Sequence, residues 1–176
     1  MAGTQATPRW ALPSAKRKPR GAASVKARER FAKPLPDTTD EELARQRALF
    51  ERHDQVEYAI RLPLSPTVNN YRAVVRGRLI TSAEGREYHA AVKQFWIAHW
   101  NGWPPEPLTG RIRLCVEVCF PTARVADVSN RIKALEDALT AAGAWEDDSQ
   151  IDDLHFRRGA ISRGCGYCDV WIETLE

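Results

Sequence analysis

The 176-residue chain has 43% apolar and 28% charged residues and a net charge of +3, an ordinary composition for a globular protein. No apolar run approaches the roughly 18 residues of a membrane-spanning helix, and the basic N-terminus lacks the apolar segment of a secretory signal. We therefore expect one compact domain that works in a cytoplasm, without a membrane partner.

The positive charge is concentrated at the N-terminus. Residues 1–33 hold nine basic side chains and one acid, a net charge of +8, so the remaining residues together carry −5. Because its apolar surface is small, the segment 1–36 is expected to be a disordered basic arm. Such an arm could follow the phosphate backbone of a nucleic acid, or it could only keep the protein in solution. An Arg-rich, acid-poor start also occurs in organellar transit peptides, but its prolines and basic clusters fit a tail better.

The first predicted helix and strand follow this arm. Residues 37–55 are expected to form a short helical extension with Thr39 as its N-cap. Leu43 and Phe50 lie on one weakly apolar stripe of that helix. A strand is predicted over residues 56–62, and it ends before two prolines.

The middle of the chain predicts a loop, a long helix and a second strand. Residues 65–82 are expected to form a loop with a short extended segment. Thr81 and Glu84 make a capping-box pattern, which predicts that a helix begins there. The alternating segment 111–120 predicts a strand. Apolar or half-polar side chains recur at helical spacing in the long helix: Tyr88, Val92, Phe95 and His99.

The C-terminal part predicts a helix from Asp127 to near Gly143, then strands near residues 154–161 and 167–175. The order β-α-β-α-β-β indicates an α/β (α+β) fold. We expect a single small domain over residues 56–176, with a mixed sheet and two main helices.

The cysteines admit a zinc site as one interpretation. Cys115 and Cys119 could form one half of it, and Cys165 and Cys168 the other. The first two lie four residues apart on a predicted strand, about 13 Å along its axis. Ligands that each lie about 2.3 Å from one zinc cannot be so far apart. Buried, reduced thiols are therefore the better interpretation. The chain also lacks a phosphate-binding loop and a serine-hydrolase elbow.

The stretch ADVSNRIKALEDALTAAGAWEDDSQIDD, residues 126–153, gathers most of the polar residues of interest. On a helical wheel Asn130, Lys133 and Asp137 fall opposite an apolar side that is expected to pack against the sheet. One interpretation is a solvated face, with a Lys133–Asp137 pair worth a few tenths of a kcal/mol. The apolar side consists of Ile132, Leu135, Leu139 and Ala142.

The other interpretation is a cation site. Asp127 lies at the helix start, and Trp145 can anchor the chain so that Asp147 and Asp148 are held near the helix end. Carboxylate oxygens are ligands that Mg²⁺ prefers, and Lys133 is placed to meet a phosphate. A dense group of carboxylates repels itself unless solvent or a metal is present. This interpretation predicts metal-assisted phosphate chemistry.

The Asp-x-x-Asn-x-x-Lys pattern and the following DALTAAGAWEDDSQIDD closely resemble the RusA family of Holliday-junction resolvases. The upstream LPLSPTVNNYRAVVRGRLITSAEGREYHAAV is similar to the opening of the same family. The resemblance runs in order from about Glu57 to Thr174 and covers 118 of 176 residues. It implies a Mg²⁺-dependent endodeoxyribonuclease that acts on four-way DNA junctions in recombination and repair. It also implies a small α/β domain that forms a homodimer, of bacterial, phage or prophage origin.

The resemblance also implies roles for individual residues. Asp127 and Asp148 would be catalytic, metal-binding carboxylates, with Asp147 beside them as a further metal ligand. Lys133 would be the catalytic lysine near the scissile phosphate. The implied DNA-binding residues are Arg76, Arg78, Asn130 and Arg124.

Two departures from the family pattern leave alternatives open. The family usually has Asp-x-Asp-Asn, and Ser129 stands here in place of the second acid; a run of arginines before the motif is reduced to Arg124. Ser129 could cap the helix. The protein could instead have lost cleavage and kept junction binding as a scaffold. A third possibility is a general metal-dependent nuclease for RNA or single strands.

Overall fold

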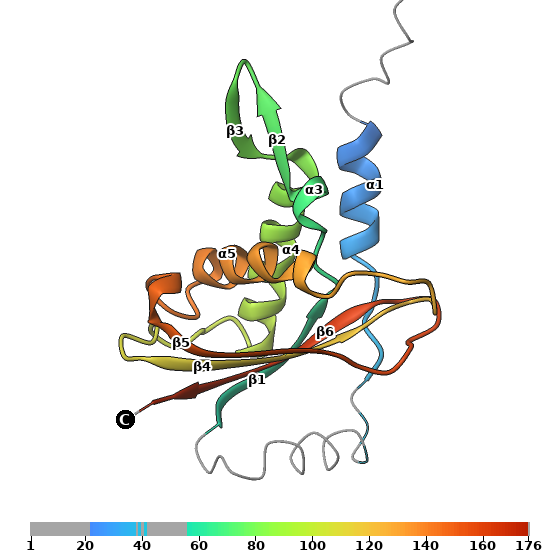
Figure 1. Cartoon of the computed structure of the whole chain (residues 1–176). Coiled ribbons are helices and arrows are strands. Elements are labelled where there is room, and N and C mark those ends of the chain that lie inside the picture. Colours follow the sequence, from blue (N-terminus) through green and yellow to red (C-terminus); the bar gives the residue numbers. More distant parts are fainter. Residues whose placement is uncertain (1–21, 38, 40, 42–55, 176) are drawn as a thin grey trace, which may run out of the picture.

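The protein is described by a computed structural model that covers residues 22–37, 39, 41 and 56–175. A four-stranded mixed sheet has the order β1-β6-β4-β5, in which β4 and β5 are parallel and the other neighbouring pairs are antiparallel. Figure 1 shows the two main helices, α4 and α5, on one face of this sheet. The expected α/β (α+β) class with a mixed sheet is confirmed. The strands are β1 (Val56–Pro63), β4 (Ile112–Cys119), β5 (Ile151–Arg158) and β6 (Tyr167–Thr174).

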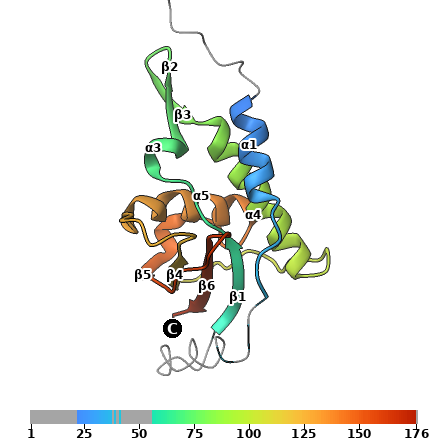
Figure 2. The same ribbon diagram turned by 90° about the vertical axis from the view of Figure 1, so that its right-hand side faces the viewer.

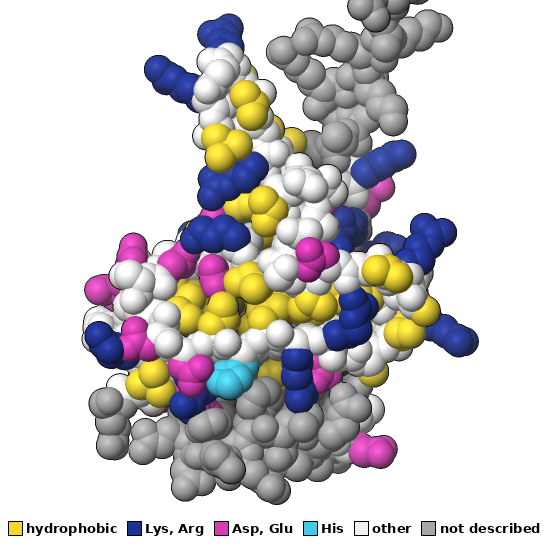
Figure 3. Space-filling view, in the orientation of Figure 1, with side chains coloured by type: hydrophobic (Ala, Val, Ile, Leu, Met, Phe, Trp, Pro, Cys, Tyr) yellow, Lys and Arg dark blue, Asp and Glu magenta, His cyan; other side chains and the backbone are white. Residues whose placement is uncertain are grey.

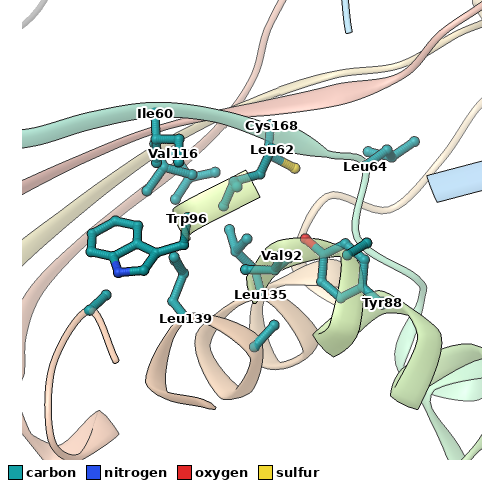
Figure 4. Close-up of a cluster of buried hydrophobic side chains, with 14 of the residues drawn as sticks. Ile60, Leu62, Leu64, Tyr88, Val92, Trp96, Val116, Leu135, Leu139 and Cys168 are labelled. Atoms are coloured by element: carbon teal, nitrogen blue, oxygen red, sulfur yellow. The ribbon is translucent and has the colours of Figure 1, made fainter. Parts of the chain in front are cut away.

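The core lies between this sheet and the helices α4 (Ala83–His99) and α5 (Ile132–Ala142). Val116 and Val118 of β4 point into it, and so do Leu135 and Leu139 of α5, as their apolar periodicity predicts. Trp96 of α4 is fully buried among them (Figure 4). Burying each large aliphatic side chain stabilises such a core by about 1.5–3 kcal/mol.

The position of α5 follows from the connection it makes. β4 and β5 are parallel, and parallel neighbours need a crossover that returns over one face of the sheet. α5 supplies that crossover, which turns its outer side away from the sheet. It ends at Gly143, whose positive φ of 88° allows the chain to reverse toward β5.

The segment between β1 and α4 differs from the loop predicted for it. A one-turn helix, α3 (Val68–Tyr71), leads into an antiparallel hairpin of β2 (Arg72–Val75) and β3 (Arg78–Thr81). The hairpin projects from the body of the protein (Figure 1). The N-cap of α4 is Ser82, whose hydroxyl accepts a hydrogen bond from Gly85 N at 3.0 Å, one residue after the predicted position.

A further helix, α1 (Ala22–Phe31), lies where disorder was expected for residues 1–36. Figures 1 and 2 show it beside α4. Phe31 is 2% exposed and packs edge-on against Tyr88 of α4, and Arg28 pairs with Glu87 at 3.1 Å. The expectation of disorder is therefore wrong for this helix, because its one large aromatic side chain finds an apolar site on α4. The helix predicted over residues 37–55 lies outside the described residues, apart from residues 37, 39 and 41.

The described residues contain no helix that is both long and apolar enough to cross a bilayer. Three cysteines are buried free thiols, which is the interpretation that was preferred to a zinc site: Cys115, Cys119 and Cys168. Burial raises the pKa of the Cys115 thiol to about 12, so that thiol is not a ready metal ligand.

Candidate active site

Lys133 lies at the centre of a polar network on the outer side of α5. Its Nζ is 2.8 Å from Asp137 Oδ1 on the same helix and 2.5 Å from Asp148 Oδ2. The predicted i, i+4 pair is therefore present, and a carboxylate 15 positions away joins it. Because the apolar side of α5 is buried, this network faces outward from the domain.

Asp148 is held in place by the turn that connects α5 to β5. It opens a short 3₁₀ helix, η3 (Asp148–Gln150). Trp145 is 1% exposed and anchors this turn, and its Nε1 donates a hydrogen bond to Asp148 Oδ1 at 3.3 Å. The Thr140 hydroxyl donates to the same oxygen. The predicted role of Trp145 as an anchor is confirmed, and both Asp148 oxygens accept hydrogen bonds.

Asp147 fixes the start of η3 by a capping box. Its side chain accepts a hydrogen bond from Ser149 N at 2.9 Å, and Gln150 Oε1 accepts one from Asp147 N at 2.9 Å. These bonds from Ser149 lower the pKa of Asp147. Asp147 is thus an ionised neighbour of the network with a structural task of its own.

Asp137 connects Lys133 to a second group of side chains, from α3, β2 and α4. Its Oδ2 accepts hydrogen bonds from the Tyr71 hydroxyl at 2.5 Å and from Arg72 Nη2 at 3.0 Å. The Tyr71 oxygen also lies 3.0 Å from His89 Nε2. Since the Tyr71 proton points to Asp137, His89 must donate its Nε2 proton to Tyr71.

Glycine at position 85 allows this arrangement. A Cβ at Gly85 would lie 2.8 Å from Tyr71 Cδ2 and 2.9 Å from Tyr71 O, closer than non-bonded carbon and oxygen atoms approach. The missing side chain lets Tyr71 pack directly on the first turn of α4. His89, one turn further along α4, then lies within reach of the Tyr71 hydroxyl.

The protonation states of the network follow from burial and hydrogen bonding. Burial acts to raise the pKa of Asp148, but the hydrogen bonds from Lys133, Thr140 and Trp145 outweigh it and lower that pKa. Burial acts to lower the pKa of Lys133, and its bonds to Asp137 and Asp148 outweigh this and raise it. Burial lowers the pKa of His89, so its ring is neutral at pH 7. The centre therefore holds a protonated lysine beside an ionised Asp148.

Asp127 lies before the 3₁₀ turn η2 (Ser129–Arg131) that leads into α5, so the main helix begins later than predicted. Its exposed carboxylate accepts hydrogen bonds from Ser129 Oγ at 2.6 Å and Ser129 N at 3.0 Å. The hydroxyl bond is the main reason why the pKa of Asp127 is lowered. The capping interpretation of Ser129 is wrong: its side chain caps no helix but donates a hydrogen bond to Asp127.

An open recess of about 530 Å³ lies over the network. Lys133, Asp137, Asp147 and Asp148 line it, together with Tyr71 and His89. Asp127 is not among the described residues that line it. The structure thus brings together four of the polar residues that the sequence singled out, whereas Asp127 lies outside this lining, five residues before α5 begins.

The other predicted site residues lie apart from this recess. Asn130 is exposed in η2. Arg76 and Arg78 are exposed at the tip of the β2–β3 hairpin, where Arg76 adopts a φ of 51°. Arg124 is exposed in the loop after β4. In Figure 3 acidic side chains gather over the end of α5, whereas basic ones gather at the hairpin tip and over the loops at the opposite side.

The carboxylates provide part of what a hard cation needs. Among the described residues, no three His, Cys, Asp or Glu side chains gather closely enough to hold a metal by themselves. The lowered pKa values of Asp127 and Asp148 keep both carboxylates ionised at neutral pH, and Mg²⁺ commonly takes one or two carboxylates and completes its shell with water and phosphate. The donor set therefore fits a water-rich Mg²⁺ site and does not fit an all-protein cage.

Sequence reasoning missed Tyr71, Arg72, His89 and Thr140 as members of the network. Thr140 carried a usable signal, because it stands one turn after Asp137 on the same helix. Tyr71, Arg72 and His89 carried none, since the predicted loop over residues 65–82 gave no reason to place them beside α5.

The sequence of this chain is similar to those of known proteins. Residues 63–164 match the family model described as Endodeoxyribonuclease RusA. A protein of Escherichia coli K12 named Crossover junction endodeoxyribonuclease RusA is 35% identical over 107 residues, covering 61% of this chain and 87% of that protein. The protein of the same name from Enterobacteria phage 82 is 34% identical over the same coverage. That from Escherichia coli O139:H28 is 33% identical over 118 residues, 67% of this chain and 95% of that protein.

Proposed function

The chain belongs to the RusA family of endodeoxyribonucleases, and we propose that it cleaves four-way DNA junctions in a Mg²⁺-dependent reaction. Three relatives from bacteria and a phage carry the name crossover junction endodeoxyribonuclease. Their organisms favour a role in the recombination or repair of bacterial or phage DNA, and a place in the cytoplasm.

The observation that carries this proposal is the contact of Lys133 with Asp148. It joins the last residue of the Asp-x-x-Asn-x-x-Lys motif to the acidic turn that follows α5, so two separate signals of the sequence meet in one open recess. A protonated lysine beside ionised carboxylates suits the chemistry of a phosphodiester. The cation can neutralise phosphate charge, and the carboxylates can hold a metal.

Asp127 and Asp148 are the residues proposed to hold Mg²⁺, with Asp147 close by. The bound ion supplies Lewis-acid polarisation of the phosphate and lowers the pKa of a water molecule. The three carboxylates of Asp137, Asp147 and Asp148 outnumber the two cations, Lys133 and Arg72, that line the recess. That excess of negative charge favours a divalent cation.

The protein side chains prepare the site in two ways. Lys133 is kept protonated by Asp137 and Asp148, so its ammonium group is ready to donate to a non-bridging phosphate oxygen and to stabilise the charge that develops there. Tyr71 and Arg72 hold the Oδ2 atom of Asp137, and its Oδ1 atom contacts Lys133, so the three partners together fix the position of the lysine at the recess.

We propose that the protein acts as a homodimer. Paired incisions across a four-way junction need two active sites related by a two-fold axis, and a symmetric dimer provides them. The exposed Arg76, Arg78 and Arg124, with Asn130, are proposed to contact DNA. Because the body of the chain is acidic, DNA contact must depend on such local basic surfaces.

A junction-binding scaffold without cleavage is the less supported alternative. A decayed site is expected to lose several of its groups, whereas Asp127, Lys133 and Asp148 are all present with a supporting set of hydrogen bonds. The Ser129 hydroxyl also acts on Asp127, so position 129 still serves the carboxylate before the helix.

The direct test uses the purified full chain on a synthetic four-way junction and on a linear duplex of matched sequence, each with Mg²⁺ or with a chelator. We expect cleavage of the junction alone, and only with the metal. Equal cleavage of the linear duplex would favour a general nuclease. Metal-independent junction binding without any cleavage would favour the scaffold.

A further inference from the structure

A second cavity, of about 360 Å³, lies where the N-terminal segment meets the loops around the sheet. Its walls come from the end of α1 and the residues after it, from the loop after β4, and from residues 164–166 before β6. The volume is in the range of small-molecule sites. Residues 30–35 form one side of the cavity and lie outside the segment 63–164 that matches the family.

The charged side chains around this cavity are all positive. Arg30, Lys33, Arg124 and Arg131 line it, and no acidic residue does so in the described part of the chain. Arg30 pairs with Glu84 at 2.8 Å. Lys33 and Arg124 form no ion pair with a described residue. Two uncompensated cations at one cavity attract an anion.

Arg131 adds a partly buried guanidinium to the same wall. It donates to the backbone oxygen of Ser65 and lies over the Phe120 ring, with 5.3 Å from Cζ to the ring centroid. Its Nε is buried without a hydrogen-bond partner, and burial lowers its pKa. A partly buried guanidinium without a paired carboxylate is costly, so an anion in the cavity would offset part of that cost.

The rest of the wall is apolar, which limits the kind of anion. Leu35, Pro63, Leu64 and Pro121 line the cavity beside the cations. Inorganic phosphate alone would leave these surfaces unused, whereas a phosphate that carries a sugar and base would cover them. Ala126 lines the cavity and is followed by Asp127, so a strand bound at the proposed active site passes close by.

We propose that this cavity binds a nucleotide: a phosphate of a DNA strand held by Lys33, Arg124 and Arg131, with its nucleoside against the apolar wall. This inference rests on the proposed function, because the nucleotide is taken to belong to a strand of the DNA substrate. The N-terminal segment then supplies positive charge beside a motif whose preceding arginines are reduced to one.

Three charge reversals test the proposal on the full chain. Lys33→Glu and Arg124→Glu act on exposed side chains of the cavity, and both variants are expected to fold. Lys93→Glu is the matched control, because Lys93 is exposed on α4 and no residue of α4 lines the cavity. Circular dichroism checks the fold of each variant.

The probes are deoxyadenosine monophosphate, inorganic phosphate, an eight-nucleotide single strand and a four-way junction. Affinities are measured by calorimetry for the small probes and by fluorescence anisotropy for DNA. We expect each cavity variant to weaken binding of the single strand about tenfold, the loss of one charge-assisted contact, and the control to change it less than twofold. If the cavity variants abolish binding of the monophosphate, the cavity also accepts a free nucleotide. If the cavity variants weaken binding of the single strand but not of the monophosphate, the ligand of the cavity is a DNA strand.

Equal losses in Lys33→Glu and Lys93→Glu would overturn the proposal, since the effect would then be one of overall charge. So would single-strand and monophosphate affinities that neither cavity variant changes. Binding of these two probes does not require cleavage. A chain that binds them through the cavity but leaves junctions intact would therefore contradict the proposed function and support this inference.

Discussion

Lys133, the proposed catalytic lysine, makes two contacts of different kinds. The bond to Asp137 lies within α5, and the bond to Asp148 reaches a different element. Either bond alone would be a modest surface pair of at most about 1 kcal/mol. Together they hold the ammonium in a fixed place at the recess, which is the arrangement that stabilisation of a phosphate transition state requires.

Replacing Lys133 by Gln is expected to remove catalysis and to spare binding. The amide keeps most of the side-chain length but cannot neutralise phosphate charge, so single-turnover junction cleavage should fall by at least about a hundredfold. Junction affinity should change only severalfold. Lys93→Gln, on the exposed side of α4, serves as the control. Near-normal cleavage by Lys133→Gln would exclude the lysine from the site.

Ser129 is expected to set the acid limit of cleavage through Asp127, a proposed metal ligand. Its hydroxyl donates to Asp127 and lowers the pKa of that carboxyl. A lowered pKa keeps Asp127 ionised at a pH where an ordinary aspartate is protonated. Ser129→Ala should raise the pKa of Asp127 and move the acid limb of the rate–pH profile to higher pH. A profile that does not move would show that ionisation of Asp127 does not limit the rate.

Ser129→Asp provides the complementary comparison across a Mg²⁺ titration. The natural Ser129 protein is expected to cleave four-way junctions, because Asp127 and Asp148 can satisfy an ion that needs few protein carboxylates. If the natural protein is inactive at every Mg²⁺ concentration and Ser129→Asp cleaves, the junction-binding alternative is correct.

Helix α1 has one large buried side chain, Phe31, at its contact with α4. Phe31 is 2% exposed against Tyr88, whereas Val25 on the same helix is 55% exposed. Phe31→Ala should lower the free energy of unfolding by about 3 kcal/mol, measured by urea denaturation, and Val25→Ala should lower it by less than about 0.5 kcal/mol. Equal small effects would show that α1 does not contribute to the core in solution.

Elements with a strong periodic pattern could be predicted from the sequence, and those decided by tertiary contacts could not. The apolar spacing of α5 and the alternation of β4 correctly gave a helix and a buried strand. The β2–β3 hairpin was missed because its strands show no alternation of polar and apolar residues in the sequence. The structure agrees with this pattern, since Val74 and Leu79 are both exposed and no side of the hairpin is buried by apolar side chains. Helix α1 was missed because its sequence has little apolar surface apart from Phe31.

The candidate site was predictable only where its residues lie close together in the chain. Lys133 and Asp137 share one face of a helix, and Trp145 marked the position of the acidic turn. The approach of Tyr71 and His89 to Asp137 depends on the close packing of α3 against Gly85. That packing brings together residues 66 positions apart, which no local pattern indicates.

The distribution of charge over the whole chain predicts a salt-dependent contribution from the N-terminus. Residues 1–21 hold five basic side chains and no acid, whereas the body is acidic. Deleting them should weaken junction binding and reduce the slope of log affinity against log salt by up to about 4.5. Cleavage at saturating protein should persist, because every proposed catalytic residue lies beyond residue 126. Identical slopes before and after deletion would show that this segment does not contact DNA.

The most direct test of the acid–lysine site is single-turnover cleavage of a four-way junction by Asp148→Asn, beside Asp152→Asn. The first change removes the negative charge that Lys133 contacts. The second removes a carboxylate of β5 that lies outside the recess and pairs with Arg111. We predict that Asp148→Asn loses cleavage by at least about a hundredfold while it still binds the junction, and that Asp152→Asn retains full activity. Full cleavage by Asp148→Asn, or an equal loss in both variants, would contradict the assignment of this network as the active site.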